Sequence, residues 1–430
     1  MFQPVKEDFL HYLWKTKMVK PEDWVTTNGV PVRIVDYGVC NVDSGPDFFN
    51  AKVEMEGTLW AGNIEMHVYS SDWKSHGHNA DRAYDNVILH VVYEHDLKPD
   101  SVEKPANIPT IELKGRIPKI FMERYLTLMQ SQLEIPCQRL ISHVDASRIG
   151  LWKYALTIER LHQKANHAAT VLFHHNNDWE ETLYIMLARY FGSKVNTAPF
   201  EMLAQNLPLN IILKNRDKPH AVDALFFGQA GMLDAVYTDE YYRQLKEEYR
   251  FLQKKYRLTP INPVAWKFSK MRPVNFPTVR LAQFAALLQK STHLFSKIKE
   301  AAHVDDLRKL LTGEPHNYWN NHYRFGKESP VLNKEISEDF AGLLIINTIA
   351  PVLYLYGKTM QDDVYIDRAI YWLESVKSEQ NHIIQAWKKS GINAKSAFDS
   401  QALIHLKQNY CNELKCLSCT IGHEIMGKLA

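Results

Sequence analysis

The chain has 430 residues, 45% of them hydrophobic, so it is long enough for two or three domains with substantial cores. Its net charge of +2 neither demands nor excludes a polyanionic partner, and a nucleic-acid site would have to be a local basic patch. No stretch approaches the roughly 18 unbroken apolar residues of a membrane span, and the N-terminus does not read as a secretory signal. We therefore expect a cytoplasmic protein that does not enter a membrane.

The first part of the chain predicts a domain with helices and a mixed sheet. The assignment follows from apolar spacing, β-branched runs and turn residues. The expected elements are a helix at 5–17, a strand at 30–38, a two-stranded hairpin at 45–73, a polar segment at 75–85 that is helical in its second half, a buried strand at 86–95 and a strand at 108–115. This order indicates an α/β or α+β arrangement.

After about residue 120 the apolar spacing has the period of helices. One expected helix begins at Trp179, because Asn176, Asn177 and Asp178 precede it and acids occupy its first turn. We predict two domains, an α/β domain at residues 1–120 and a mainly helical domain at 121–430, and hence an α+β fold class overall.

Two acids and a histidine lie along the predicted hairpin. Asp47 begins the first strand, after the Gly45-Pro46 turn, and Glu65 lies near the end of the second. Carboxylates at the ends of adjacent strands can share a divalent cation, and Mg²⁺ often needs only two from the protein. Glu65 and His67 project from the same face of their strand. The hairpin therefore predicts an Mg²⁺ or Mn²⁺ site at Asp47 and Glu65, with His67 as a further catalytic residue. The alternative is a solvated or capped polar edge of the sheet.

Pro46-Asp47, a hairpin and then Glu65-Met66-His67 resemble the signature of the PD-(D/E)xK nuclease superfamily. The order of helix, strands, helix and strand is also similar to the core of that superfamily. The resemblance implies a restriction-endonuclease-like domain that hydrolyses phosphodiester bonds of DNA or RNA. Position 67 departs from the pattern, since a lysine is usual there. Histidine can replace it as a water-positioning group, with a charge that depends on its surroundings.

Five segments, which extend over nearly the full length, resemble a bacterial family known as domain of unknown function 2851. They are GPDFFNAKV, GNIEMHVYSSDWKSHGHNADRAYDNVILHVVYEHD, FFGQAGML, RPVNFPTVRLAQFAALL and YCNELKCLSCTIG. The family name implies no activity, so this resemblance concerns identity more than function.

The polar segment after the hairpin carries more candidate residues. His76 and His78 lack the i, i+4 spacing of a helical zinc pair, so we do not predict a second zinc site there. We expect a helix whose Asp81 and Tyr84 face the sheet. In related nucleases such a helix contacts phosphate or supports the metal site, and the alternative is ordinary packing. His90, inside an apolar strand, is expected to be a core residue with satisfied hydrogen bonds.

A basic and aromatic segment, KFSKMRPVNFPTVR, is a candidate nucleic-acid surface. Basic side chains reach phosphates and aromatic rings can stack on bases. The candidate phosphate contacts are Lys267, Lys270, Arg272 and Arg280. The alternative, which we favour, is a proline-rich loop whose aromatic side chains pack inward.

The cysteines form the second candidate metal site. Cys411, Cys416 and Cys419 cluster near the C-terminus, and Cys137 could supply a fourth ligand. Thiolate clusters of this kind suit Zn²⁺ or an iron–sulfur cluster. An early cysteine with a late triplet is similar to the arrangement in some iron–sulfur nucleases of the PD-(D/E)xK superfamily. The alternative is a set of buried thiols, and Cys40 is expected to be structural.

Three functions remain open at this point. The first is a divalent-metal-dependent nuclease acting on DNA or RNA. The second is a catalytically inactive nucleic-acid-binding or protein-interaction scaffold with a nuclease-like fold, which the missing lysine at position 67 favours. The third is an unrelated interaction protein whose aromatic-rich helices bind another protein. The arrangement of Asp47, Glu65 and His67 in space discriminates among them.

Overall fold

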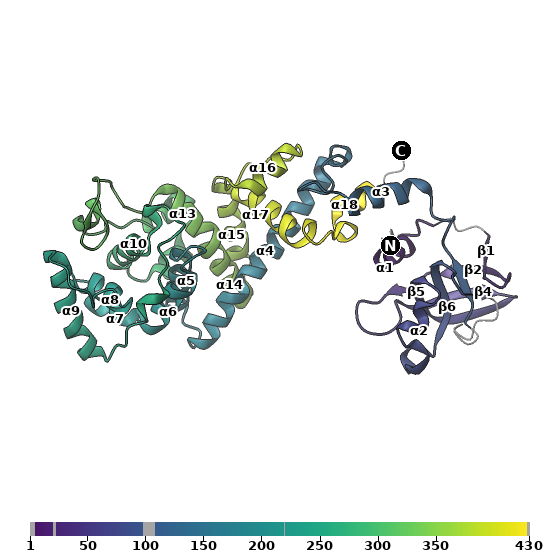
Figure 1. Cartoon of the computed structure of the whole chain (residues 1–430), viewed down its shortest axis with the longest axis horizontal. Coiled ribbons are helices and arrows are strands. Elements are labelled where there is room, and N and C mark those ends of the chain that lie inside the picture. Colours follow the sequence, from purple (N-terminus) through teal and green to yellow (C-terminus); the bar gives the residue numbers. More distant parts are fainter. Residues whose placement is uncertain (1–4, 20–22, 98–107, 219, 428–430) are drawn as a thin grey trace. The chain divides into compact units, whose positions relative to one another are not determined.

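The computed structural model describes residues 5–19, 23–97, 108–218 and 220–427. The chain forms two compact units (Figure 1). Unit 1 comprises Met1–Trp152, Lys389–Gly391 and Leu406–Ala430, and unit 2 comprises Lys153–Lys388 and Ile392–His405. An N-terminal mixed sheet followed by a mostly helical region confirms the α+β prediction at this level.

Unit 1 is built on a seven-stranded mixed sheet in the order β1-β2-β4-β5-β6-β7, with β3 paired to β4. The strands are β1 (Trp24–Val25), β2 (Pro31–Asp36), β3 (Val39–Cys40), β4 (Phe48–Met55), β5 (Thr58–Tyr69), β6 (Val87–Glu94) and β7 (Thr110–Glu112). The pairs up to β4–β5 are antiparallel, whereas β5–β6 and β6–β7 are parallel. The predicted hairpin is therefore the centre of the sheet, and the apolar strand beside it is buried as expected.

A β-bulge sets the register at the beginning of β4. Phe48 pairs with Ile64 of β5, but from Ala51 onward the pairing is shifted by one residue. Asn50 lies inside this irregular stretch with a left-handed φ of 57°. Because a one-residue slip reverses which face a side chain occupies, the bulge decides what stands opposite Asp47. It places Asp47 beside Glu65.

Unit 1 also contains several helices, of which the first two in the chain contact strand β5. The helices are α1 (Glu7–Lys15), α2 (Asp72–Ser75), α3 (Lys119–Met129), the first turns of α4 (Ala146–His174), and α18 (Thr420–Gly427). The predicted apolar face of α1 is confirmed, since Phe9, Leu10, Leu13 and Trp14 are fully buried. The expected α-helix in the second half of 75–85 is wrong. The segment forms two 3₁₀ turns, His78–Ala80 and Arg82–Tyr84, because the left-handed Gly77 and the extended Asp81 interrupt it.

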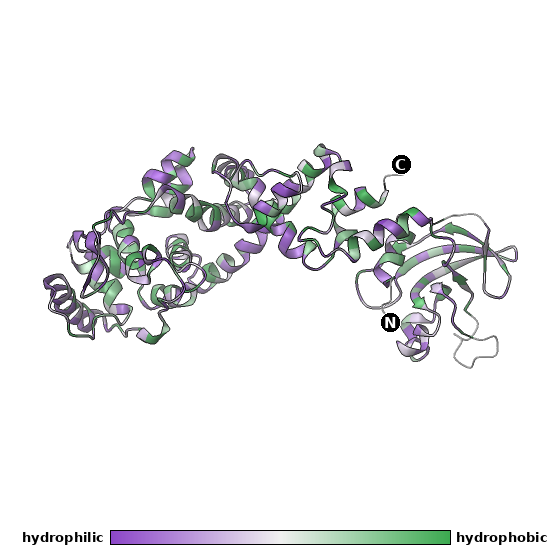
Figure 2. Ribbon diagram, turned by 45° about the horizontal axis from the view of Figure 1, so that its top comes forward, coloured by the Kyte–Doolittle hydropathy of each residue, from purple (hydrophilic) through white to green (hydrophobic). Residues whose placement is uncertain are grey.

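Unit 2 is a helical assembly with one small two-stranded sheet, β8 (His322–Arg324) and β9 (Lys327–Glu328). Most helices carry both hydrophilic and hydrophobic residues, which is typical of helices that bury one face (Figure 2). They are the rest of α4, α5 (Trp179–Phe191), α6 (Thr197–Asn206), α7 (Leu209–Asn215), α8 (Ala221–Gln229), α9 (Glu240–Tyr256), α10 (Pro277–Lys290), α11 (Leu294–Glu300), α12 (Val304–Leu310), α13 (Glu338–Leu344), α14 (Ala350–Met360), α15 (Asp363–Ser375), α16 (His382–Lys389) and α17 (Ala397–Leu406).

The predicted beginning of α5 is confirmed. Asp178 is the N-cap residue, and its Oδ1 accepts from the backbone N–H of Glu180 at 2.9 Å and of Glu181 at 3.1 Å. These bonds satisfy donors that have no partner within the helix.

One helical stretch, Glu338–Met360, is long and apolar enough to cross a membrane by length and composition. It comprises α13, a π-helical segment (Ile345–Ile349) and α14. Of its most apolar 18-residue stretch, 78% is buried inside the structure, as is typical of a core helix. The cytoplasmic location stays a prediction.

Asp223 is a buried acid of unit 2 whose pKa is raised. Its Oδ2 accepts a hydrogen bond from the hydroxyl of Tyr241 at 2.8 Å. Burial raises the pKa of this carboxyl from 3.8 to about 6. The folded state therefore holds a proton that the unfolded state releases between about pH 4 and 6, so this group's contribution to stability falls as the pH rises through that window.

We expect Asp223→Asn to remove this pH dependence while keeping an acceptor for Tyr241. Relative to the variant, the wild-type free energy of unfolding should decline by roughly 1–3 kcal/mol between pH 4 and pH 7. Urea unfolding at several pH values measures the difference. Parallel curves for the two proteins would show that Asp223 titrates normally in the folded state.

Candidate metal centre

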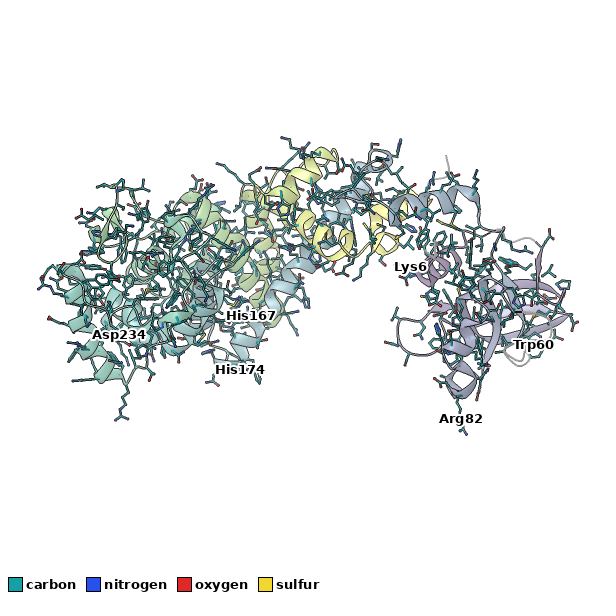
Figure 3. The ribbon with its side chains drawn as sticks, viewed as in Figure 1. Lys6, Trp60, Arg82, His167, His174 and Asp234 are labelled. Carbon is teal, nitrogen blue, oxygen red and sulfur yellow. The ribbon has the colours of Figure 1, made fainter. Side chains whose placement is uncertain are left out.

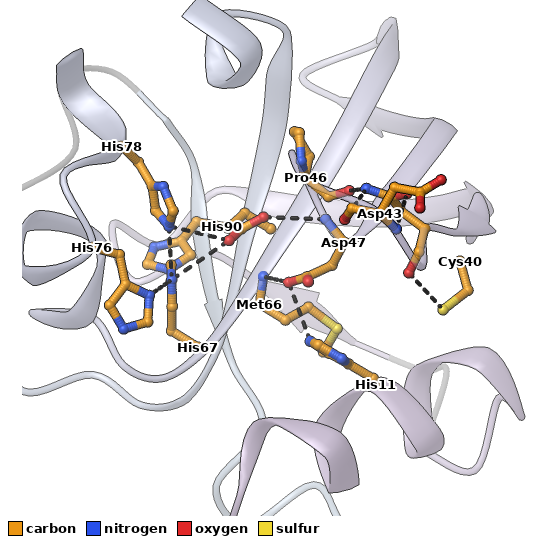
Figure 4. A network of polar contacts seen from close by, with 12 residues as sticks. His11, Cys40, Asp43, Pro46, Asp47, Met66, His67, His76, His78 and His90 are labelled. Atoms are coloured by element: carbon orange, nitrogen blue, oxygen red, sulfur yellow. Dashed lines mark hydrogen bonds and ion pairs between the residues drawn. The ribbon is translucent and has the colours of Figure 1, made fainter. Parts of the chain in front are cut away.

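Two hydrogen bonds connect the loop before β4 to strand β5. Both involve Asp47, and one of them joins it to Glu65. The backbone N–H of Asp47 donates to Oε2 of Glu65 at 3.2 Å, and the N–H of Met66 donates to Oδ2 of Asp47 at 2.8 Å. The close-up in Figure 4 shows both. The pairing of β4 with β5 thus brings the two predicted acids together, as the sequence pattern required.

The amide side chain of Asn41 holds the loop that carries Asp47. Nδ2 of Asn41 donates to the backbone carbonyls of Asp43, Ser44 and Pro46, at 3.1, 3.2 and 3.1 Å. These bonds hold the Gly45-Pro46 turn, so the position of Asp47 does not depend on the strand alone.

Three histidines gather beside Glu65, and none of them was predicted as a metal ligand, since His67 was expected to act on the water or the phosphate. His67 Nε2 lies 3.1 Å from Nδ1 of His76 and 3.2 Å from Nε2 of His78. Oε1 of Glu65 lies 3.3 Å from Nε2 of His78 and 3.6 Å from Nε2 of His67. The ligand atoms of His67, His76 and His78 all lie within 4.8 Å of one another.

These distances fit one bound divalent ion. Zinc lies about 2.0–2.1 Å from histidine nitrogen and carboxylate oxygen, so ligand atoms of a tetrahedral site stand about 3.3 Å apart. Four separations lie around this value: Nε2 of His67 to His76, His78 and Glu65, and Oε1 of Glu65 to His78, at 3.1 to 3.6 Å. Imidazole nitrogen suits zinc and the later transition metals, whereas Mg²⁺ prefers oxygen. The donor set therefore favours Zn²⁺ over the Mg²⁺ expected from two carboxylates.

The short backbone between His76 and His78 explains how both face the same point. Gly77 between them adopts a left-handed φ of 76°, which favours glycine. The indole N–H of Trp73 donates to Oδ1 of Asn79 at 2.8 Å and ties the ends of this loop together. His76 and His78, at positions i and i+2, can thus face one ion without lying on a helix. The i, i+4 spacing used in the sequence analysis applies only to zinc-binding histidines on a helix.

Burial favours the neutral form of His67 and His78. His67 is 1% exposed, and burial together with neighbouring His90, His76 and His78 lowers its pKa to about 2. Burial also lowers the pKa of His78. Neutral imidazole is the form that binds a metal, so no proton competes for these nitrogens.

Glu65 is the acid of the cluster. It is 5% exposed, and burial, followed by the charge of Asp47, raises its pKa to about 9. A carboxyl in this state is a strong candidate ligand, because a cation bound beside it would offset the cost of burying its charge. His76 is exposed, so the cluster opens to solvent on that side.

Two aromatic rings support the ligands from behind. His67 Nδ1 and His90 Nε2 share a hydrogen bond of 2.8 Å, the kind of contact that orients a metal-binding imidazole. Burial lowers the pKa of His90 to about 3, so it stays neutral. It lies in the core as expected, but only its Nε2 is hydrogen-bonded, because its buried Nδ1 has no partner. Tyr84 stacks on His78 with ring centroids 3.8 Å apart.

His11 of α1 completes the surroundings of Asp47. Its Nε2 lies 3.2 Å from Oδ2 of Asp47. Burial lowers its pKa, but the hydrogen bond and the charge of Asp47 outweigh burial and leave the pKa raised. A histidine with a raised pKa therefore stands beside Asp47, although the sequence pattern pointed to none there.

The remaining predicted binding residues have other positions. Asp81 caps a 3₁₀ turn, since its Oδ1 accepts from the N–H of Ala83 at 2.9 Å. Lys267, Lys270 and Arg272 are exposed in unit 2.

Arg280 is not available to a nucleic acid in this structure, which corrects that prediction. It is 9% exposed, and its guanidinium donates to Gln283 at 2.8 Å and Asn275 at 2.6 Å and lies over the ring of Phe340. Trp266 is also buried, with its indole N–H on the carbonyl of Ala230, so the favoured inward packing holds for this aromatic residue.

A protein-family model matches residues 7–382, which contain every residue of the cluster. The chain belongs to this family, described as protein of unknown function (DUF2851). No curated protein and no solved structure matches the chain. The family match spans the N-terminal sheet and most helices of this DUF2851 protein, and it ends before Cys411.

The histidine ligands are the main residues that the sequence reasoning missed. The available signal was density: His67, His76, His78 and His90 lie within 24 residues, and three of the four make ring contacts with Trp73. Each spacing alone is uninformative, because the turn at Gly77 and the parallel pairing of β5 with β6 bring them together.

We expect His78→Ala to lower the affinity for Zn²⁺ by roughly 100-fold or more, beyond the 10–100-fold typical of changes behind the ligands. Isothermal titration of the metal-stripped full chain measures this. His174→Ala is the control, since His174 is an exposed residue at the C-terminal end of α4, in unit 2 (Figure 3). Equal affinities for the two variants would exclude His78 from the metal site.

Proposed function

We propose that unit 1 of this DUF2851 protein is a divalent-metal-dependent nuclease that hydrolyses phosphodiester bonds of DNA or RNA. The observation that carries the proposal is that His76, His78 and Glu65 all approach Nε2 of His67, with Asp47 beside Glu65 at the strand junction. Carboxylates and imidazoles around a solvent-facing position are typical ligands of a metal ion that catalyses hydrolysis.

The sheet supports the nuclease reading over a general hydrolase. Helix α1, strands β2, β4 and β5, the short helix α2 and strand β6 follow one another in the order of the PD-(D/E)xK core that the sequence resembles. Asp47 and Glu65 occupy the two acidic positions of that signature. The resemblance therefore has support from both the motif and the element order.

His67 takes a different role from the one expected of a lysine at this position. It is buried and neutral, and its Nε2 faces Glu65 and the other two histidines. A neutral imidazole cannot offset negative charge that develops on a phosphoryl group, but it can bind a metal. We therefore assign His67 as a ligand with Glu65, His76 and His78.

A divalent ion held by these ligands would polarise a phosphoryl oxygen and lower the pKa of a bound water. Asp47 accepts the N–H of Met66 and faces His11 through the same oxygen, Oδ2. In the proposal this pair supplies the fixed charges beside the reacting phosphate. His11 is the cation that substitutes for the missing lysine, because its pKa is raised by Asp47 although burial opposes the shift.

The second candidate function is a catalytically inactive scaffold with the same fold. The specific observation in its favour is that position 67 is a buried histidine without positive charge. Such a protein would bind metal and nucleic acid but not cleave. The alternatives therefore differ in turnover and not in metal content.

The decisive experiment is a cleavage assay with the full-length chain, stripped of metal and then supplied with Zn²⁺, Mn²⁺ or Mg²⁺. Single- and double-stranded DNA and RNA are the substrates. We expect cleavage that depends on added metal. Asp47→Asn and Glu65→Gln should each lower the rate by roughly 100-fold or more, a loss typical of removing a group that stabilises developing charge.

Asp43→Asn is the matched control, because Asp43 is an exposed acid of the same loop and lies four residues before Asp47. It should retain the wild-type rate. Cleavage that survives in Asp47→Asn and Glu65→Gln would place the activity elsewhere. Nucleic-acid binding without cleavage under any metal would favour the scaffold.

A further inference from the structure

Four of the five cysteines converge in unit 1, far from one another in sequence. Cys137 lies before the 3₁₀ turn Ile141–His143, and Cys411 ends a π-helical extension (Lys407–Cys411) of α17. Cys416 begins the 3₁₀ turn Cys416–Ser418, and Cys419 immediately precedes α18. None of the four is in a disulfide.

The four thiols form one mutually interacting group. Cys137 interacts electrostatically with each of the other three, Cys411 with Cys416 and Cys419, and Cys416 with Cys419. The four thiols therefore lie in one neighbourhood, although no three of their sulfurs come within 4.8 Å of one another. Cys40, the fifth cysteine, lies in β3, and its Sγ contacts the carbonyl of Asn41 at 3.6 Å.

The backbone brings the three late cysteines to one point. The N–H of Leu414 donates to the carbonyl of Cys411 at 3.2 Å, and Leu414 itself has a left-handed φ of 52°. The helix therefore breaks after Cys411, as its spacing from Cys416 requires. The N–H of Cys419 then donates to the carbonyl of Cys416 at 3.3 Å, which closes the turn between the x2 pair.

Gly422 is required by this close packing. A Cβ at position 422 would lie 1.9 Å from the backbone oxygen of Cys416, far inside any allowed contact. The first turn of α18 can thus approach the Cys416 turn only because residue 422 is glycine.

Cys419 is surrounded by hydrogen-bond donors. The backbone N–H groups of Ile421 and Gly422 and the indole N–H of Trp152 lie near its sulfur and lower the pKa of this thiol, against the larger effect of burial. The indole nitrogen of Trp152 is buried and has no hydrogen-bond partner. Several N–H donors around one sulfur stabilise a thiolate, whereas a neutral thiol is a weak acceptor that gains little from them.

Burial makes it unfavourable for the four thiols to ionise without a cation beside them. Cys137, Cys416 and Cys419 are 7–8% exposed. Burial raises the pKa of all four thiols, to about 12 for Cys411 and Cys416. A soft cation would displace the thiol protons. Its positive charge would stabilise the four thiolates, an effect that the N–H groups near Cys419 have only in part.

We propose that Cys137, Cys411, Cys416 and Cys419 hold one thiolate-bound metal centre, either Zn²⁺ or an iron–sulfur cluster. Both take four cysteine ligands. The centre is separate from the histidine cluster and does not depend on the proposed nuclease activity.

The centre has a structural role in unit 1. The C-terminal segment already contacts the N-terminal elements, since the hydroxyl of Tyr12 lies 2.9 Å from Nδ1 of His423 and Arg124 donates to the carbonyl of Met426 at 3.3 Å. A shared metal would fasten Cys137 to cysteines well over 200 residues later and restrict the unfolded chain. It would fix α18 against α3 and α1.

The test is metal analysis of the full-length protein, purified both in air and without oxygen, after growth with zinc and iron. We expect about one zinc per chain bound by thiolates, or about four iron and four sulfide with the visible absorption of a cluster. Cys137→Ser and Cys416→Ser should each lose this metal, and Cys40→Ser should keep it. His78→Ala should also keep it, which separates zinc at the thiols from zinc at the histidine cluster.

Thiol protection keeps the proposal testable if the serine variants fail to fold. In the wild-type protein an alkylating reagent should modify Cys40 alone, and a chelator strong enough to strip the metal should expose the other four. Protection that a chelator leaves unchanged, or preparations that contain no thiolate-bound zinc and no iron, would overturn the proposal and leave plain buried thiols.

Discussion

The candidate site depends on the pairing of β4 with β5 and on the bulge that shifts it. With Phe48 opposite Ile64, the N–H of Asp47 reaches Glu65 and the N–H of Met66 reaches Asp47. Without the shift, Phe48 would stand opposite Glu65 and Asp47 would turn to the other face of the sheet. One extra residue in a strand therefore decides whether two acids can act together.

The second constraint is burial of the histidine cluster between the sheet and the loop after β5. Low exposure makes His67 neutral and leaves Glu65 with a high pKa, which are opposite consequences of the same desolvation. Such a pairing is a poor electrostatic stabiliser of fold, because it leaves polar groups in the core. In our proposal it is a preformed cation site, since neutral imidazoles and a buried carboxyl gain most from a bound metal.

Unit 1 thus carries two proposed ligand sets that are built in different ways. The histidine and glutamate ligands lie within 14 residues, from Glu65 to His78, on one strand and the loop that follows it. The cysteines come from two distant parts of the chain and meet through a broken helix and a glycine-dependent turn. The first set opens to solvent at His76, which suits a reaction, whereas the second is enclosed, which suits a structural centre.

The sequence by itself determined the elements whose signals are local. Alternation and β-branching identified the hairpin and the buried strand, apolar spacing identified the buried face of α1, and Asp178 identified the beginning of α5. The hairpin predicted that Asp47 and Glu65 lie at neighbouring positions of two paired strands, whereas the bulge that sets them beside each other was not predicted. The spacing of Cys411, Cys416 and Cys419 likewise pointed to a break in the helix, which the left-handed Leu414 provides.

Only the tertiary structure decided what depends on contacts between separate segments. The parallel pairing of β5 with β6 sets His90 behind His67, and Gly77 turns His76 and His78 toward Glu65. The same holds for Arg280, whose charge suggested a surface contact but whose guanidinium is held inside by Asn275, Gln283 and Phe340. Residue type and spacing cannot reveal burial of this kind, because the neighbours that desolvate a side chain or satisfy its hydrogen bonds come from elsewhere in the chain.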